Sequence, residues 1–90
     1  MANKRKIKQD INIVCADLFA ECIAASLYRS GKDEDTVNGI LTSIIVVHDD
    51  FIRRISHPEP GLPQKTYFTK LKVDFTKQAT EIIDQINAMG

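Results

Sequence analysis

The sequence predicts an all-α fold, an antiparallel up-down-up three-helix bundle formed by a single domain over residues 1–90. Apolar residues recur at spacings of three and four in three segments, 7–29, 35–56 and 64–89. Two breaks containing glycine or proline separate these segments. The segments have nearly equal lengths, and their short connections make neighbouring helices antiparallel. A basic N-terminal segment, 1–6, precedes the first predicted helix.

The first predicted helix is apolar around most of its circumference. One apolar row follows the helical spacing along one face: Ile7, Ile11, Val14, Leu18, Cys22 and Ala25. A second row flanks it: Ile13, Ala16, Ala20, Ile23 and Leu27. An arc this broad exceeds what one contact needs, so we expect a homodimer in which two bundles form a larger one. The candidate dimer surface is Val14, Leu18, Ile23 and Leu27. The alternative is a central helix that contacts two neighbours within one bundle.

The second and third predicted helices have narrower apolar faces. Gly31 suits the end of the first helix, and the acidic residues at 33–35 favour the start of the second. The second row is Val37, Leu41, Ile44, His48, Phe51 and Ile55. The β-branched cluster at 40–47 is also typical of a strand, but the helical spacing continues unbroken to the end of the row. Three prolines and a glycine at 57–63 then end the helix. The third row is Phe68, Leu71, Phe75, Ala79, Ile82, Ile86 and Met89.

Composition excludes several classes of protein. Twelve basic and twelve acidic residues give a net charge of zero, unlike the basic excess of a general nucleic-acid binder. Cys15 and Cys22 are seven residues apart, about 10.5 Å along a helix, too far to form a disulfide with each other. We therefore expect a reduced, cytoplasmic protein. Asp17 and Glu21 interrupt the apolar stretch after the basic N-terminus, so we expect neither a signal peptide nor a membrane span.

No established catalytic motif is present: the sequence has no glycine-rich phosphate loop, no HExxH and no GxSxG. We therefore expect a protein that is not an enzyme and carries no cofactor or metal. His48 nevertheless interrupts an apolar row, and antiparallel packing predicts Asp17 and Asp74 as its neighbours. Histidine and carboxylates at one level of a bundle are the groups of a metal or acid–base site. The alternative, which the missing paired ligands favour, is that this buried polar candidate is a hydrogen-bonded core histidine.

The predicted bundle is polarised along its length. The end that carries the N-terminus and the 57–63 loop has nine basic and five acidic side chains, a net charge of plus four, and the opposite half has minus four. The candidate anion contacts there are Lys4, Arg5, Lys6, Lys8, Arg53 and Arg54. We therefore expect a small non-enzymatic interaction protein that self-associates and binds another macromolecule. The alternative function is a phosphate- or nucleic-acid-binding module that uses this basic end.

Overall fold

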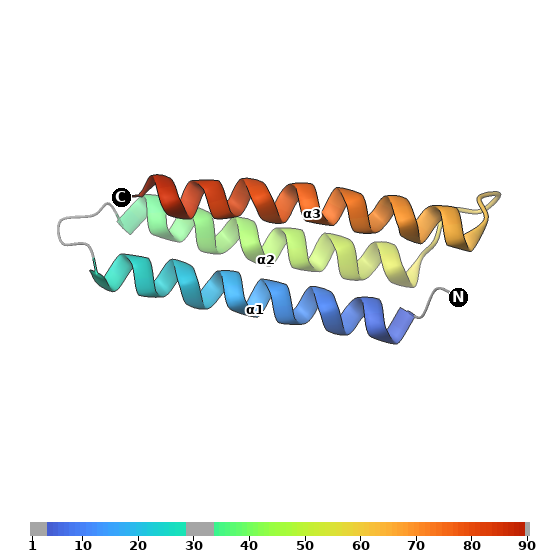
Figure 1. Ribbon diagram of the computed structural model, residues 1–90, viewed down its shortest axis with the longest axis horizontal. Helices are drawn as coiled ribbons and strands as arrows, with labels where there is room; N and C mark the ends of the chain where they lie inside the picture. Colours follow the sequence, from blue (N-terminus) through green and yellow to red (C-terminus); the bar gives the residue numbers. More distant parts are fainter. Residues whose placement is uncertain (1–3, 29–33, 90) are drawn as a thin grey trace.

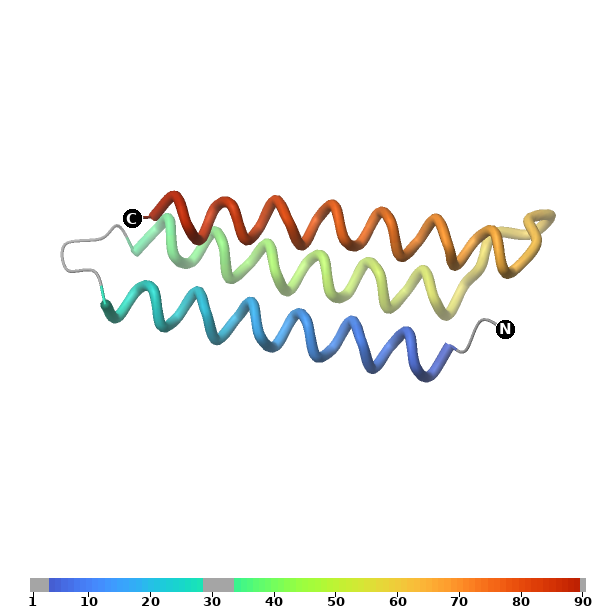
Figure 2. The backbone as a smooth tube through the Cα atoms, in the orientation of Figure 1, coloured from blue at the N-terminus to red at the C-terminus, as the bar shows by residue number. Residues whose placement is uncertain are grey.

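The computed structural model describes residues 4–28 and 34–89 and confirms the all-α three-helix bundle (Figure 1). Helix α1 spans Lys4–Tyr28, α2 spans Glu34–Ser56 and α3 spans Gln64–Ala88. Successive helices run in opposite directions, so that the N-terminus lies at the same end as the α2–α3 loop (Figure 2). The bundle measures 50 × 18 × 16 Å.

The helix boundaries differ from the predicted ones chiefly at the beginning of α1. Residues 4–6 were expected to precede the helix, but they form its first turn. Their side chains are exposed, so hydrophobic spacing carried no signal of this turn. The start of α2 has Glu34 and Asp35, and its last turn has Arg53 and Arg54. Acidic side chains at the start of a helix and basic side chains at its end both interact favourably with the helix dipole and stabilise α2.

The α2–α3 loop has the geometry that its composition predicts. The backbone N–H of His57 donates to the carbonyl of Arg53 at 3.0 Å, which closes the last turn of α2. Gly61 then adopts φ = 91°, a backbone conformation that favours glycine. Pro63 caps α3, and its carbonyl accepts a hydrogen bond from the N–H of Tyr67 at 3.0 Å.

One hydrophobic core runs the length of the bundle, and its buried members are Ile7, Ile11, Cys15, Leu18, Cys22, Ile40, Ile44, Phe51, Ile55, Phe68, Leu71, Phe75, Ala79, Ile82 and Ile86. The rings of Phe51 and Phe75 pack edge to face across α2 and α3, with centroids 5.3 Å apart. Among the described residues no polar or charged side chain is buried. Both cysteines are free and buried, and desolvation raises the pKa of each thiol.

Candidate functional site

The side of α1 that is turned away from α2 and α3 carries an apolar surface. We call this surface the outer face; it comprises Ile13, Ala16, Ala20, Ile23 and Leu27. All five are exposed, and the larger side chains expose 54%, 38% and 81% of their areas at positions 13, 23 and 27. Successive residues of a helix turn by about 100°, which places this row opposite the buried row centred on Leu18. The outer face contributes little to the core of a single bundle.

The predicted dimer surface combined residues from two sides of α1 and is partly wrong. Leu18 is 5% exposed and belongs to the core. Val14 is half-buried and packs against the core beside α3. Ile23 and Leu27 lie on the outer face, as the prediction requires. The physical reason is rotational: five residues separate Leu18 from Ile23, a turn of about 140°, so the two side chains cannot share one contact.

A groove of about 390 Å³ lies between α1 and α3. Its lining is mostly apolar and includes the core residues Ile7, Ile11, Leu71 and Phe75. Val14 lies on its α1 side and Ile83 on its α3 side, and polar groups from Asp10, Lys72, Thr76 and Thr80 also line it. The groove therefore shows where the packing of α1 on α3 is open to solvent.

The beginning of α1 carries a cluster of cationic side chains. Lys4, Arg5 and Lys8 line a shallow hollow together with Gln9 and Asn12. Within residues 4–28 and 34–89, none of these three cations forms an ion pair with a carboxylate. We call these three residues the basic cluster.

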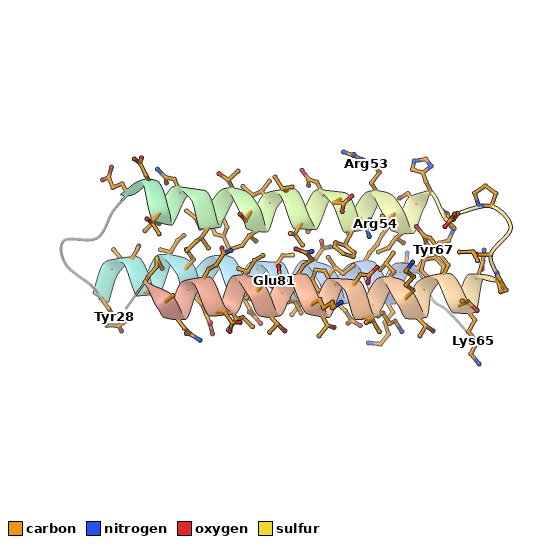
Figure 3. The ribbon with its side chains drawn as sticks, turned by 90° about the horizontal axis from the view of Figure 1, so that it is seen from above. Tyr28, Arg53, Arg54, Lys65, Tyr67 and Glu81 are labelled. Carbon is orange, nitrogen blue, oxygen red and sulfur yellow. The ribbon has the colours of Figure 1, made fainter. Side chains whose placement is uncertain are left out.

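The other predicted anion contacts are placed differently. Lys6 forms an ion pair with Asp10, with Nζ and Oδ1 3.5 Å apart. Arg53 is exposed on α2 and points away from the bundle (Figure 3). The six predicted residues thus share one end of the molecule, and the three of the basic cluster line a common hollow.

Arg54 holds α2 against α3 and is not a free anion contact. Its Nη2 lies 2.9 Å from Oδ2 of Asp50, and its Nη1 lies 4.0 Å from Oδ2 of Asp74. The guanidinium carbon sits 4.7 Å from the centroid of the Phe51 ring, a cation–π contact. The Tyr67 hydroxyl donates to the backbone carbonyl of Arg54 at 2.9 Å. The i, i+4 spacing of Asp50 and Arg54 was the sequence signal for this role.

The predicted buried cluster around His48 does not form. His48 is 33% exposed, and its Nε2 lies 2.6 Å from the side-chain oxygen of Asn12, to which it donates a hydrogen bond. Its Nδ1 lies 3.2 Å from Oδ1 of Asp49. Asp17 is exposed on α1, and Asp74 lies beside Arg54.

The error is one of register between α1 and α2. The prediction placed His48 level with residue 16, whereas its hydrogen bond places it level with Asn12, one helical turn earlier. Asp17 is five residues beyond Asn12 and therefore points about 140° away from it. Among the described residues, no group of three or more histidine, cysteine or acidic side chains is placed to hold a metal ion. His48 is thus seen to tie α2 to α1.

Helix α1 also meets a length and composition criterion for crossing a membrane. The 25-residue helix is apolar over most of its length, and only 22% of its most apolar stretch is buried in the bundle. The same criterion is met by core helices of soluble proteins and by signal sequences near an N-terminus. The finding reflects the two apolar rows of α1.

No protein-family model, curated protein or solved structure matches this chain. Among the described residues, the two surfaces that suit binding are the outer face and the basic cluster. Both lie on α1, the helix with apolar residues on opposite sides.

Proposed function

We propose that this protein is a small non-enzymatic interaction protein that self-associates through the outer face of α1. The observation that carries the proposal is the apolar row at 13, 16, 20, 23 and 27, directed away from the core. Contiguous exposed apolar surface marks sites of protein association. Covering such surface stabilises a complex by about 25 cal/mol for each Å² of apolar area removed from water.

The spacing of the outer face suits a second helix. Its residues are separated by three, four, three and four positions, the heptad pattern that packs helices side by side. A helix pair that uses this row alone buries less than the roughly 1,200 Å² of a standard interface. We therefore expect a reversible dimer with a dissociation constant in the micromolar range.

The test is molar mass, measured by light scattering after size-exclusion chromatography over a wide range of protein concentration. We expect a rise from 10.1 kDa toward twice that value as the concentration increases. Ile13→Asp should keep the mass at that of one chain, because a carboxylate then enters the apolar interface. Val73→Asp is the matched control, since Val73 is 58% exposed on α3 and Ile13 is 54% exposed on α1. A wild-type mass of one chain at every concentration would contradict the proposal, as would equal effects of the two substitutions.

The basic cluster supports a second candidate function, contact with the phosphates of a nucleic acid. The three cations of the basic cluster line one hollow, and among the described residues none of them forms an ion pair. When such side chains neutralise the phosphates of a nucleic acid, the binding affinity falls steeply as salt increases. Fluorescence anisotropy with a labelled duplex and a labelled single strand tests this function. Binding at low salt should disappear with Arg5→Glu plus Lys8→Glu and persist with Lys65→Glu plus Lys77→Glu. Absence of binding by the wild-type protein at low salt would exclude this candidate.

A further inference from the structure

The outer face has the symmetry of a surface that pairs with itself. Its first four residues are Ile13, Ala16, Ala20 and Ile23, separated by three, four and three positions. Both the order of residue types and the spacings are the same in either direction along the helix. A two-fold axis perpendicular to α1 and level with the midpoint between the two alanines therefore brings the row of one copy against the same row of a second copy. A symmetric dimer of identical subunits requires such an isologous surface.

We propose that the occupant of the outer face is α1 of a second copy, packed antiparallel about this axis. This inference rests on the proposed self-association and adds its geometry. Ile13 of each copy then lies opposite Ile23 of the other, and Ala16 lies opposite Ala20. The alanines let the two backbones approach closely at the centre, while the isoleucines fill the space on either side of it.

The charge distribution favours the antiparallel orientation. Among the described residues, the end bearing the basic cluster has nine basic and five acidic side chains, a net charge of plus four. The opposite half has Lys77 against six acidic side chains, a net charge of minus five; these six are Asp17, Glu21, Glu34, Asp35, Glu81 and Asp84. Antiparallel pairing places opposite charges at both ends of the dimer, whereas parallel pairing places like charges together.

The edges of the outer face argue against a membrane surface as its occupant. Asp10, Asp17 and Glu21 follow one edge of the row, between the outer face and α3. Interfacial helices carry Lys and Arg along such edges because the lipid surface is anionic. The acidic edge of α1 is repelled by that surface. In the antiparallel dimer the two Asp17 carboxylates lie on either side of the axis, a like-charge pair that is exposed to water.

Distances between spin labels test the geometry. A cysteine is introduced at Gln9 or at Asp17 in a chain whose two buried cysteines are alanine, and circular dichroism checks that the helices persist. In the antiparallel dimer the two labels at 17 are two residues apart along the helices, and those at 9 are 18 residues apart, about 27 Å. Dipolar broadening of the continuous-wave electron paramagnetic resonance spectrum should then show a short distance of about 10 Å for position 17. The pulsed measurement should give about 30 Å for position 9, after adding the separation of packed helices.

Each other outcome has a defined meaning. Short distances at both positions, together with a dimeric mass, would retain the proposed self-association and overturn the antiparallel geometry. No intermolecular distance at either position, together with the mass of one chain, would overturn both. Flotation of the monomeric protein with anionic vesicles would assign the outer face to a membrane instead, and would also overturn both.

Charge reversal provides an independent readout. In this dimer Lys8 of one copy lies level with Tyr28 of the other, at the end of the bundle where the first turn of α2 carries Glu34 (Figure 1). We expect Lys8→Glu to weaken the dimer about fivefold at low salt, and Lys8→Glu combined with Glu34→Lys to restore it. Lys65→Glu, on α3 and away from the outer face, is the control and should leave the dissociation constant within twofold. Failure of the double variant to recover affinity would count against the antiparallel pairing.

Discussion

Two leucines of α1 lie on opposite sides of the helix, Leu18 in its interior and Leu27 in its last turn. Leu18 is 5% exposed and Leu27 is 81% exposed. Replacing either with alanine hardly changes helix propensity, because leucine and alanine are both strong helix formers. The comparison therefore measures burial alone, and it tests the rotation of α1 on which the assignment of the outer face depends.

We expect Leu18→Ala to lower the free energy of unfolding by about 3 kcal/mol, because it removes buried atoms and leaves a cavity that the bundle only partly fills. For a chain of this length that loss corresponds to a fall in Tm of roughly 12–24 °C. Leu27→Ala should change the free energy by less than about 0.5 kcal/mol, since water already covers that side chain. The loss at Leu18 is a large fraction of the roughly 5–13 kcal/mol expected for the whole domain.

Urea unfolding followed by circular dichroism is the assay, with equal slopes confirming that the variants unfold over the same surface. The protein concentration is kept well below the dimer dissociation constant, because association would add its own stabilisation. If Leu27→Ala lowered the free energy of unfolding as much as Leu18→Ala, the reasoning would be refuted, because α1 would then have to pack against α2 and α3 through the outer face. Under dimeric conditions, Leu27→Ala should cost more than it does in the monomer, because Leu27 belongs to the outer face that the second copy covers.

Three further predictions concern single features of the bundle. Gly39→Ala should stabilise the protein by about 0.5–1 kcal/mol, because a methyl group at this position of α2 meets nothing within 4 Å. Gly61→Ala should destabilise the protein, because Gly61 has a φ of 91°. Thermal unfolding measures both effects. Tyr67→Phe should cost about 1 kcal/mol through its lost hydrogen bond to α2, and Tyr28→Phe, which is 86% exposed, should cost nothing measurable in urea unfolding. The two cysteines of α1 should react slowly with a thiol reagent at pH 7, and rapid reaction would show that α1 opens readily. Because burial raises their pKa in the folded state, the stability they contribute is fully present below the ordinary thiol pKa and is lost as the pH rises through the raised values.

The parts of the fold predicted correctly are those in which one apolar row of the helix is continuous and the other apolar residues are scattered. In α3 the predicted row is buried from Phe68 to Ile86, because most of the other positions are polar and the exposed apolar residues Val73 and Ile83 do not form a second continuous row. In α2 the spacing of three and four outweighed the β-branched residues that favour a strand. Glycine and proline determined the loop between α2 and α3, since Gly61 adopts a positive φ that favours glycine and the ring of Pro63 fixes its own φ at the start of α3.

The rotation of α1 could not be read from its own sequence. Both of its rows are apolar, so neither pattern nor propensity decides which row faces the core. The choice depends on how closely each row fits α2 and α3, which is a property of three helices together. Cys15 illustrates this: the predicted row contains Val14, but Val14 is only half-buried and the adjacent Cys15 is buried in the core.

The spacing of apolar residues also could not predict the register of α1 against α2. A shift of one helical turn preserves every apolar contact type, yet it exchanges the polar residues that meet across the interface. This is why His48 meets Asn12 and not Asp17. Polar partners therefore carry the information on register, and one hydrogen bond between side chains 36 positions apart specifies what a periodic row cannot.

The outer face and the polarised charge act over different distances, and this difference determines how the proposed dimer responds to salt. Apolar contact between two α1 helices is not screened by ions, so the affinity it provides persists at high ionic strength. The attraction between opposite ends acts across exposed groups and fades beyond about 8 Å at physiological ionic strength. Salt should therefore weaken the dimer only several-fold, while removing most of the preference for antiparallel over parallel pairing. With spin labels at position 9, the fraction of dimers that show a short distance, which is the parallel fraction, should increase with salt, while the molar mass falls only slightly. A mass that collapses to one chain in moderate salt would instead mean that charge, and not the apolar row, supplies the binding energy.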